Sequence, residues 1–139
     1  MRLELTRRAD YAVRAMLALG QQPEGLLSGA RIAAAMAIPP RFVAQVMGDL
    51  VQAGLVEART GRAGGYRLAR GLEEISILEI VEAIEGDARQ RTCVLRGGPC
   101  AVDGFCDVHE IFSAAQDALL LRLSQATLAG ALQGQGTGE

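Results

Sequence analysis

The first element that the sequence predicts is a helix beginning near Thr6. Beyond that residue the apolar side chains lie three and four positions apart, which is the spacing of one helical face: Ala9, Ala12, Val13, Met16 and Leu17. Thr6 is a suitable N-cap, and Gly20 marks the expected end of the helix. We therefore expect an amphipathic helix over about 6–20.

Two shorter helices joined by a tight turn are predicted next. Ser28 caps the first, which stops at Ala37-Ile-Pro-Pro40. Proline is tolerated in the first turn of a helix, so the second runs from about Pro40 to Ala53, with Gly54 just past its end. Its two faces differ, one apolar (Val43, Val46, Met47, Leu50) and one polar or small (Arg41, Gln45, Gly48, Gln52). Such a pair is typical of a helix-turn-helix.

A two-stranded wing is predicted directly after these helices. Leu55–Ala58 has the composition of a strand, 59–65 is a glycine-rich turn, and Tyr66–Ala69 is the returning strand. Four arginines lie on or beside it: Arg59, Arg62, Arg67 and Arg70. A helix-turn-helix followed by a basic wing indicates a DNA-binding domain.

The second half of the chain is predicted to hold a loop between two helices. Ser76-Ile-Leu-Glu79 is a capping box that opens a helix through Glu85, and Gly86 stops it. A loop over 87–104 follows. The last helix is expected from about Phe105 to Leu132. Its apolar residues at close to heptad spacing favour pairing with a second copy of the chain: Phe112, Ala115, Leu119 and Leu123.

Charge is distributed unevenly between the two halves. Residues 1–70 carry ten arginines against five acids, a balance of +5, and residues 71–139 carry four arginines against eleven acids, a balance of −7. A basic half favours a polyanionic partner, and an acidic half is more often a regulatory or dimerisation surface. The sequence has no apolar run of membrane-spanning length and no signal-peptide core, so we expect a cytoplasmic protein without a membrane partner.

Three cysteines and the single histidine form a candidate metal site: Cys93, Cys100, Cys106 and His109. An odd number of cysteines in a cytoplasmic chain argues against a disulfide framework. Thiolates are soft ligands, so three in one loop can hold iron or zinc. Iron–sulfur clusters normally take four protein ligands, which leaves one position for another residue. His109 lies three residues after Cys106, on the same face of the predicted helix.

Short motifs occur in a specific order along nearly the whole chain: Met1-Arg-Leu3, Asp10-Tyr-Ala-Val-Arg14, Gly54-Leu-Val56, Gly64-Gly-Tyr66, Ser76-Ile-Leu-Glu79, the cysteine loop and Thr127-Leu128. In this order they resemble the winged-helix iron–sulfur regulators of the IscR/NsrR type (Rrf family). That family usually has a basic residue just before the first glycine of the wing turn, where this chain has Thr60 between Arg59 and Arg62.

From the pattern and the resemblance together we expect a mainly α protein with three parts. Residues 1–72 form a winged helix-turn-helix domain, 73–132 hold the cluster-binding loop and the dimerisation helices, and 133–139 are a flexible tail. The expected partners are a double-stranded DNA operator and a second copy of the chain, and the resemblance implies a repressor. The expected DNA contacts are Arg41 and Gln45 at base edges, with Arg59, Thr60 and Arg62 on the wing.

The resemblance offers two residues for the fourth cluster ligand. One branch of the family uses a histidine at the position of His109, around a two-iron cluster. Another uses an aspartate at the position of Asp10, supplied by the partner chain to a four-iron cluster. Asp10 also has a simpler interpretation, as an ion-pair partner of Arg14 or Arg7. We favour His109, and therefore a [2Fe–2S] over a [4Fe–4S] cluster.

Other interpretations of the cysteines remain open at this point. One alternative is that the cysteines are small hydrophobic residues buried in the core. A second is that they bind a structural zinc ion together with His109, and a third is that they act as a thiol redox switch without a cluster. A metal-dependent enzyme or an electron carrier is a further class. The sequence shows no nucleophile paired with a base and no phosphate-binding loop with a lysine, so we predict neither an enzyme nor a small-molecule substrate.

Overall fold

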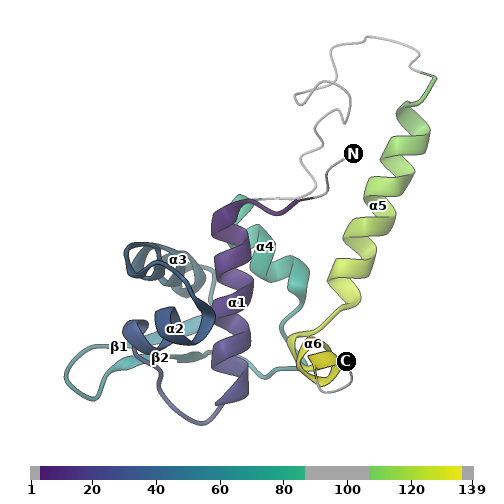
Figure 1. Ribbon diagram of the computed structural model, residues 1–139. Coiled ribbons are helices and arrows are strands. Elements are labelled where there is room, and N and C mark those ends of the chain that lie inside the picture. The colour runs from purple at the N-terminus through teal and green to yellow at the C-terminus, as the bar shows by residue number, and fades with distance from the viewer. Residues whose placement is uncertain (1–3, 87–106, 136–139) are drawn as a thin grey trace.

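The computed structural model describes residues 4–86 and 107–135, and the fold of these residues is mainly helical, as predicted (Figure 1). The elements in chain order are α1 (Arg7–Gln21), α2 (Gly29–Met36), α3 (Pro40–Gln52), β1 (Val56–Arg59), β2 (Gly65–Leu68), α4 (Ile77–Glu85), α5 (His109–Gln125) and α6 (Leu128–Gln135).

Helix α1 is the element around which the others are arranged. The Thr6 hydroxyl accepts a hydrogen bond from the Ala9 N–H at 3.2 Å, which confirms the predicted N-cap. The buried residues of α1 include four alanines and Gly20 beside the larger Met16 and Leu19, and the small positions allow neighbouring helices to come close to its backbone. α2, α3, β2, α4 and α6 all contact this one helix. The central core therefore forms around α1.

The helix-turn-helix is present as predicted. The Ser28 hydroxyl accepts from the Arg31 N–H at 3.2 Å and caps α2. The turn passes through Ala37, which has a positive φ of 52°. α3 begins at Pro40, and its apolar stripe (Val43, Val46, Met47, Leu50) is fully buried, whereas Arg41, Gln45, Gly48 and Gln52 are exposed. Both predicted faces of α3 are thus confirmed.

The wing is an antiparallel pair in which Val56 lies opposite Leu68 and Arg59 opposite Gly65. Each strand is displaced by one residue from its predicted position. A third segment pairs with the root of the wing, because Leu27 and Tyr66 exchange backbone hydrogen bonds of 3.0 and 2.8 Å. This bridge joins the wing to the residues just before α2.

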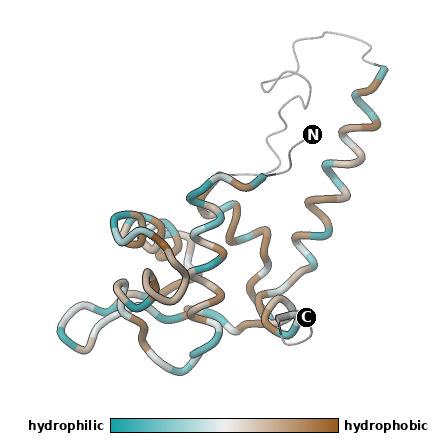
Figure 2. The backbone as a smooth tube through the Cα atoms, in the orientation of Figure 1, coloured by the Kyte–Doolittle hydropathy of each residue, from teal (hydrophilic) through white to brown (hydrophobic). Residues whose placement is uncertain are grey.

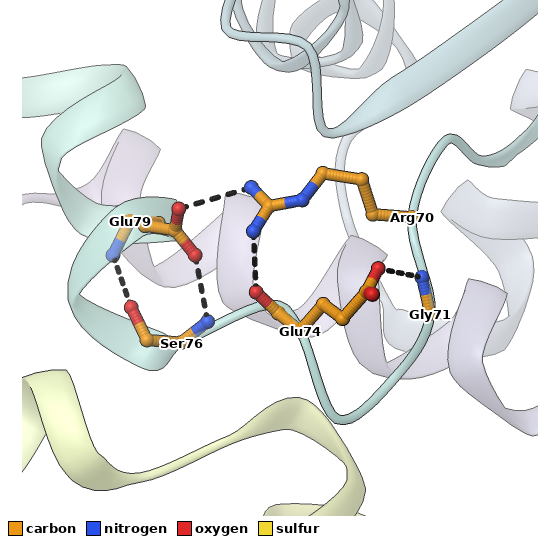
Figure 3. A network of polar contacts seen from close by, with 5 residues as sticks. All are labelled: Arg70, Gly71, Glu74, Ser76 and Glu79. Carbon is orange, nitrogen blue, oxygen red and sulfur yellow. Dashed lines mark hydrogen bonds and ion pairs between the residues drawn. The ribbon is translucent and has the colours of Figure 1, made fainter.

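The junction between the wing and α4 is a polar network (Figure 3). The Ser76 hydroxyl accepts from the Glu79 N–H at 3.1 Å, and the Glu79 carboxylate accepts from the Ser76 N–H at 2.9 Å, so the capping box is confirmed. Arg70 donates to the same carboxylate at 3.0 Å and to the Glu74 carbonyl. One glutamate therefore caps α4 and fixes the end of the wing.

The prediction of one helix from Phe105 to Leu132 was wrong. α5 begins only at His109 and ends at Gln125, and a separate helix, α6, starts at Leu128. Ala126 is extended between them because its carbonyl accepts from the Ile77 N–H at 2.8 Å. The Leu128 N–H donates to the Ile75 carbonyl, also at 2.8 Å, and the Leu128 side chain is fully buried.

The predicted heptad face of α5 is partly half-buried and partly exposed to solvent. Phe112 and Leu123 are half-buried, and α5 packs against α4 of the same chain. The most exposed large apolar side chains of α5 are Ile111 and Leu121, 68% and 59% accessible, which the predicted heptad face did not include. Leu119, which it did include, is 42% accessible. Figure 2 shows apolar residues recurring along α5 although this helix buries none of its residues fully.

The core is continuous across residue 72, where the sequence analysis placed a domain boundary. Ile75, Ile80 and Leu128 belong to the same buried cluster as Met16 and Leu19 of α1. The division into parts remains a prediction. Residues 133–135, the beginning of the predicted tail, are helical. Within the described residues, no helix has the length and apolarity needed to cross a bilayer.

We expect Glu79→Gln to destabilise the fold at neutral pH but not in acid. Burial raises the pKa of the Glu79 carboxyl, but hydrogen bonds from the Ser76 N–H and from Arg70 outweigh burial, so the pKa lies below its ordinary value. A group with a lowered pKa in the folded state stabilises that state above its unfolded pKa, and this contribution disappears as the pH falls through the folded pKa. Glutamine keeps the capping geometry and removes only the charge.

Urea unfolding at neutral and at acidic pH measures this effect. The expected loss is about 0.5–1 kcal/mol at neutral pH, the range of a partly exposed ion pair. It should shrink as the pH falls below the ordinary pKa of glutamate. Glu73→Gln, the same change at an exposed position, is the control and should have little effect. A loss that is equal at both pH values would show that the carboxylate charge contributes nothing.

Candidate nucleic-acid interface

The exposed face of α3 presents the two residues predicted to read bases. Arg41 lies in the first turn of the helix and Gln45 one turn later, and both are exposed. The Arg41 guanidinium carbon lies 4.9 Å from the centre of the Phe42 ring. Because the opposite face of α3 is buried in the core, this polar face is held outward on a rigid element.

An ion pair connects α1 with α3. Arg8 of α1 donates to the Asp49 carboxylate of α3, and both side chains are partly exposed. The two residues are 41 positions apart, so no local pattern in the sequence could have identified the contact. The pair joins α3 to the central helix.

The arginines of the wing fall into two groups. Arg67 pairs across the strands with Glu57 at 2.8 Å, and Arg70 is bound to Glu79. Arg59 and Arg62, with Thr60 between them, are exposed at the turn, and neither arginine forms a salt bridge within residues 4–86 and 107–135. The wing thus presents two cations at its tip, the ones predicted from sequence.

Two adjacent glycines lie where the wing backbone is crowded. A Cβ on Gly64 would lie 2.2 Å from the Arg59 carbonyl oxygen, and one on Gly65 would lie 2.6 Å from the Leu27 carbonyl oxygen. Gly65 also has a φ of 156°, which side chains rarely adopt. The two glycines of the Gly64-Gly-Tyr66 motif therefore have steric causes: Gly64 fits the tight turn of the wing itself, and Gly65 allows the wing root to approach Leu27.

Asp10 forms the ion pair that the sequence suggested, with Arg14 one helical turn later. The other terminal nitrogen of Arg14 donates to the Met36 carbonyl at 2.9 Å, at the end of α2. The hydrogen bond with Asp10 raises the pKa of Arg14. No contact joins Asp10 to Arg7 among the polar contacts of the described residues. Asp10 thus helps Arg14 to hold the C-terminal end of α2.

Of the predicted metal ligands, His109 and Asp10 are described, whereas Cys93, Cys100 and Cys106 lie outside the described residues. His109 is exposed at the first residue of α5. The helical face that it was predicted to share with Cys106 is not described, because Cys106 lies outside the described residues. Residues 4–86 and 107–135 contain no group of three potential metal ligands.

The end of α4 is tied to the start of α1. The Glu85 carboxylate accepts a hydrogen bond from the Thr6 N–H at 2.9 Å, although the residues are 79 positions apart. Glu85 is the last residue of α4 and precedes the segment that contains the cysteines. The sequence analysis did not predict the contact between Glu85 and Thr6, because no local pattern in the sequence indicates it.

Residues 5–133 match the family model of Rrf2, described as an iron-dependent transcriptional regulator. The chain belongs to the Rrf2 family. This confirms the resemblance drawn from the motifs, and it places the chain among transcriptional regulators rather than enzymes.

Relatives and solved structures of the Rrf2 family agree with this assignment. The chain is 33% identical over 128 residues to the regulator NsrR of Shouchella clausii, covering 91% of this chain and 86% of that protein. It is 39% identical over 85 residues to a putative HTH-type transcriptional regulator of Mycobacterium tuberculosis, but the match covers 60% of this chain and spans only 53% of that relative's length.

Among solved structures, CymR, the global cysteine regulator of B. subtilis, has a TM-score of 0.82 at 23% identity, covering 95% of this chain and 98% of that one. IscR of T. potens has a TM-score of 0.78 at 26% identity, covering 96% and 88%. The winged-helix fold of the family is thus confirmed.

Two glycine-to-alanine changes should have opposite effects on stability. Gly65→Ala should lower the free energy of unfolding by about 1–3 kcal/mol, because the methyl group meets the Leu27 carbonyl and the backbone conformation is strained. Gly48→Ala, on the open face of α3 with nothing within 4 Å, should raise it by about 0.5–1 kcal/mol. Denaturant unfolding measures both. A tolerated Gly65→Ala would contradict the close approach of the wing to Leu27.

Proposed function

We propose that this chain is a homodimeric, DNA-binding transcriptional repressor whose operator affinity is controlled by an iron–sulfur cluster that senses iron–sulfur status, redox state or nitric oxide. The observation that carries the DNA-binding part is the combination on one fold of an outward polar face on α3 and a wing tip with two arginines that form no salt bridge with any other described residue. The cluster part rests on the cysteine and histidine donors and on the iron-dependent description of the family.

Each DNA contact follows from the chemistry of its side chain. Arg41 and Gln45 lie one helical turn apart on the exposed face of α3, within reach of adjacent base edges in a major groove. Arginine matches the two acceptors of guanine, and glutamine matches the donor and acceptor of adenine. Arg59, Thr60 and Arg62 on the wing contact phosphates or the minor groove, which secures the orientation of the protein without reading sequence in the major groove.

A second copy of the chain is the proposed partner of α5. This helix has 17 residues, none of them fully buried, and Figure 1 shows it extending away from the helices around α1. Isolated helices of this length are marginal in water, and tertiary packing supplies most helical stability. Ile111, Leu119 and Leu121 supply apolar surface for pairing. A twofold dimer then presents its two α3 helices to half-sites about one helical turn of DNA apart, or a multiple of it.

The proposed cluster ligands are Cys93, Cys100, Cys106 and His109. The donor set fits: thiolates are the usual ligands of iron–sulfur clusters, and a histidine replaces cysteine in some of them. The His109 side chain is exposed and makes no hydrogen bond or ion pair in the described part of the chain. The Asp10 carboxylate is already engaged by Arg14, so its use as a ligand would compete with that pair. When bound, the cluster supplies a centre that reacts with oxidants and nitric oxide.

Measured affinities for DNA should distinguish the residues that read bases from those that bind phosphates. Arg59→Ala should weaken binding to every sequence and reduce the slope of log affinity against log salt by about one, because one phosphate contact is lost. Gln45→Ala should instead change the preference at one base position, by about 1–3 kcal/mol. Titrations of labelled duplexes at several salt concentrations measure both.

The matched control for the wing is Arg122→Ala, which removes the same charge from exposed α5. It should leave the salt slope unchanged. If Arg59→Ala and Gln45→Ala both bind like the wild-type chain at moderate salt, neither α3 nor the wing contacts DNA as proposed.

Ligand substitutions test the cluster. Cys100→Ala should abolish the visible absorbance of anaerobically purified protein, because a cluster that loses a thiolate ligand becomes labile. His109→Ala should shorten the lifetime of the cluster in air, whereas Asp10→Ala should leave it unchanged. Absorbance, iron and sulfide content measure these effects.

Glu110→Ala, the exposed neighbour of His109, is the control and should retain the wild-type cluster. A Cys100→Ala protein with full absorbance would overturn the three-thiolate site. Loss of the cluster in Asp10→Ala but not in His109→Ala would assign the fourth ligand to Asp10. A colourless wild-type protein with one zinc ion per chain would favour a structural metal, and one without metal would favour a thiol switch.

A further inference from the structure

Four side chains form a series of contacts from α1 to the first turn of α3, which we call the column: Arg14, Tyr11, Phe42 and Arg41. The Arg14 guanidinium carbon lies 5.2 Å from the centre of the Tyr11 ring. The Tyr11 and Phe42 ring centres are 5.4 Å apart at an interplanar angle of 44°. Arg41 then lies over the Phe42 ring, with its guanidinium carbon 4.9 Å from the ring centre. Two contacting aromatic rings thus each carry an arginine, at distances typical of cation–π contacts.

The inner end of this column is fixed. Tyr11 is 8% exposed and belongs to the central core. Arg14 is held from two sides, by the Asp10 carboxylate and by the Met36 carbonyl. Tilted aromatic pairs at this separation are favourable beyond their buried area. Phe42 therefore rests on a rigid support rather than on a mobile surface.

The outer end is exposed and carries a residue proposed to read DNA. Consecutive residues of an α-helix point about 100° apart, so helix geometry alone does not bring Arg41 over its neighbour Phe42. An exposed arginine without such a contact samples many rotamers and loses that freedom when it binds. The Phe42 ring restricts the Arg41 guanidinium before DNA is present.

We infer that Phe42, supported by Tyr11, is a positioning residue for Arg41: the ring holds the guanidinium at the start of α3 and thereby strengthens its base contact. Phe42 itself does not contact DNA. The inference rests on the proposed function, because it requires that α3 reads bases. A positioning role for Phe42 differs from a purely structural one. In a purely structural role, loss of the ring would weaken DNA binding whether or not Arg41 is present.

A double-mutant cycle on the full-length chain tests this inference. The probe is a duplex of about 30 base pairs that the wild-type protein selects from random DNA, long enough for two half-sites. Phe42→Leu keeps an apolar side chain but removes the ring face, and should weaken binding about two- to fivefold, the range of an exposed cation–π contact. Phe42→Tyr keeps the ring and should bind like the wild-type chain. In an Arg41→Ala background, Phe42→Leu should cause no further loss.

A second readout is discrimination at the base position where Arg41→Ala loses its preference. Phe42→Leu should reduce discrimination there and leave it unchanged at the position read by Gln45. The inference is overturned if Phe42→Leu weakens binding equally with and without Arg41, or has no effect while Arg41→Ala does. If Arg41→Ala keeps the affinity and preference of the wild-type chain, or the wild-type chain selects no duplex, the assignment of α3 as a base reader fails and the inference fails with it.

Discussion

Burial of α1 is the constraint on which the rest of this structure depends. Five other elements pack against this one helix. Four of its buried positions are alanines, which let these neighbours come close: Ala9, Ala12, Ala15 and Ala18 are at most 3% exposed. Close-packed interiors transmit displacement rather than absorb it. A shift of α1 therefore displaces α3 and the wing together, and the Arg8 to Asp49 ion pair strengthens that connection.

The same helix is also connected to the proposed sensor. Glu85, just before the cysteine-containing segment, accepts from the Thr6 N–H, and Asp10 lies one turn further along α1. One hydrogen bond thus connects the end of α4, which precedes that segment, to the N-terminus of α1. Recruitment of Asp10 as a ligand would act more severely, because it would break the ion pair through which Arg14 holds the end of α2.

Local patterns in the sequence predicted the elements that local interactions determine. The caps at Thr6, Ser28 and Ser76 and the two faces of α3 were all recognisable from residue type and spacing. The break between α5 and α6 was not, because backbone pairing of Ala126 and Leu128 with α4 and its preceding residues imposes it. At the candidate site the sequence supplied the types of residue, whereas contacts between distant residues, such as Tyr11 with Phe42, required the fold.

The most direct test of cluster-controlled DNA binding is the affinity of one protein sample for its selected duplex before and after anaerobic removal of iron, with iron and sulfide quantified in both states. We expect a coloured protein whose affinity changes by about 5- to 150-fold between the two states, the usual range of allosteric coupling. Equal affinity with and without iron and sulfide, or a protein that never contains them, would contradict cluster control.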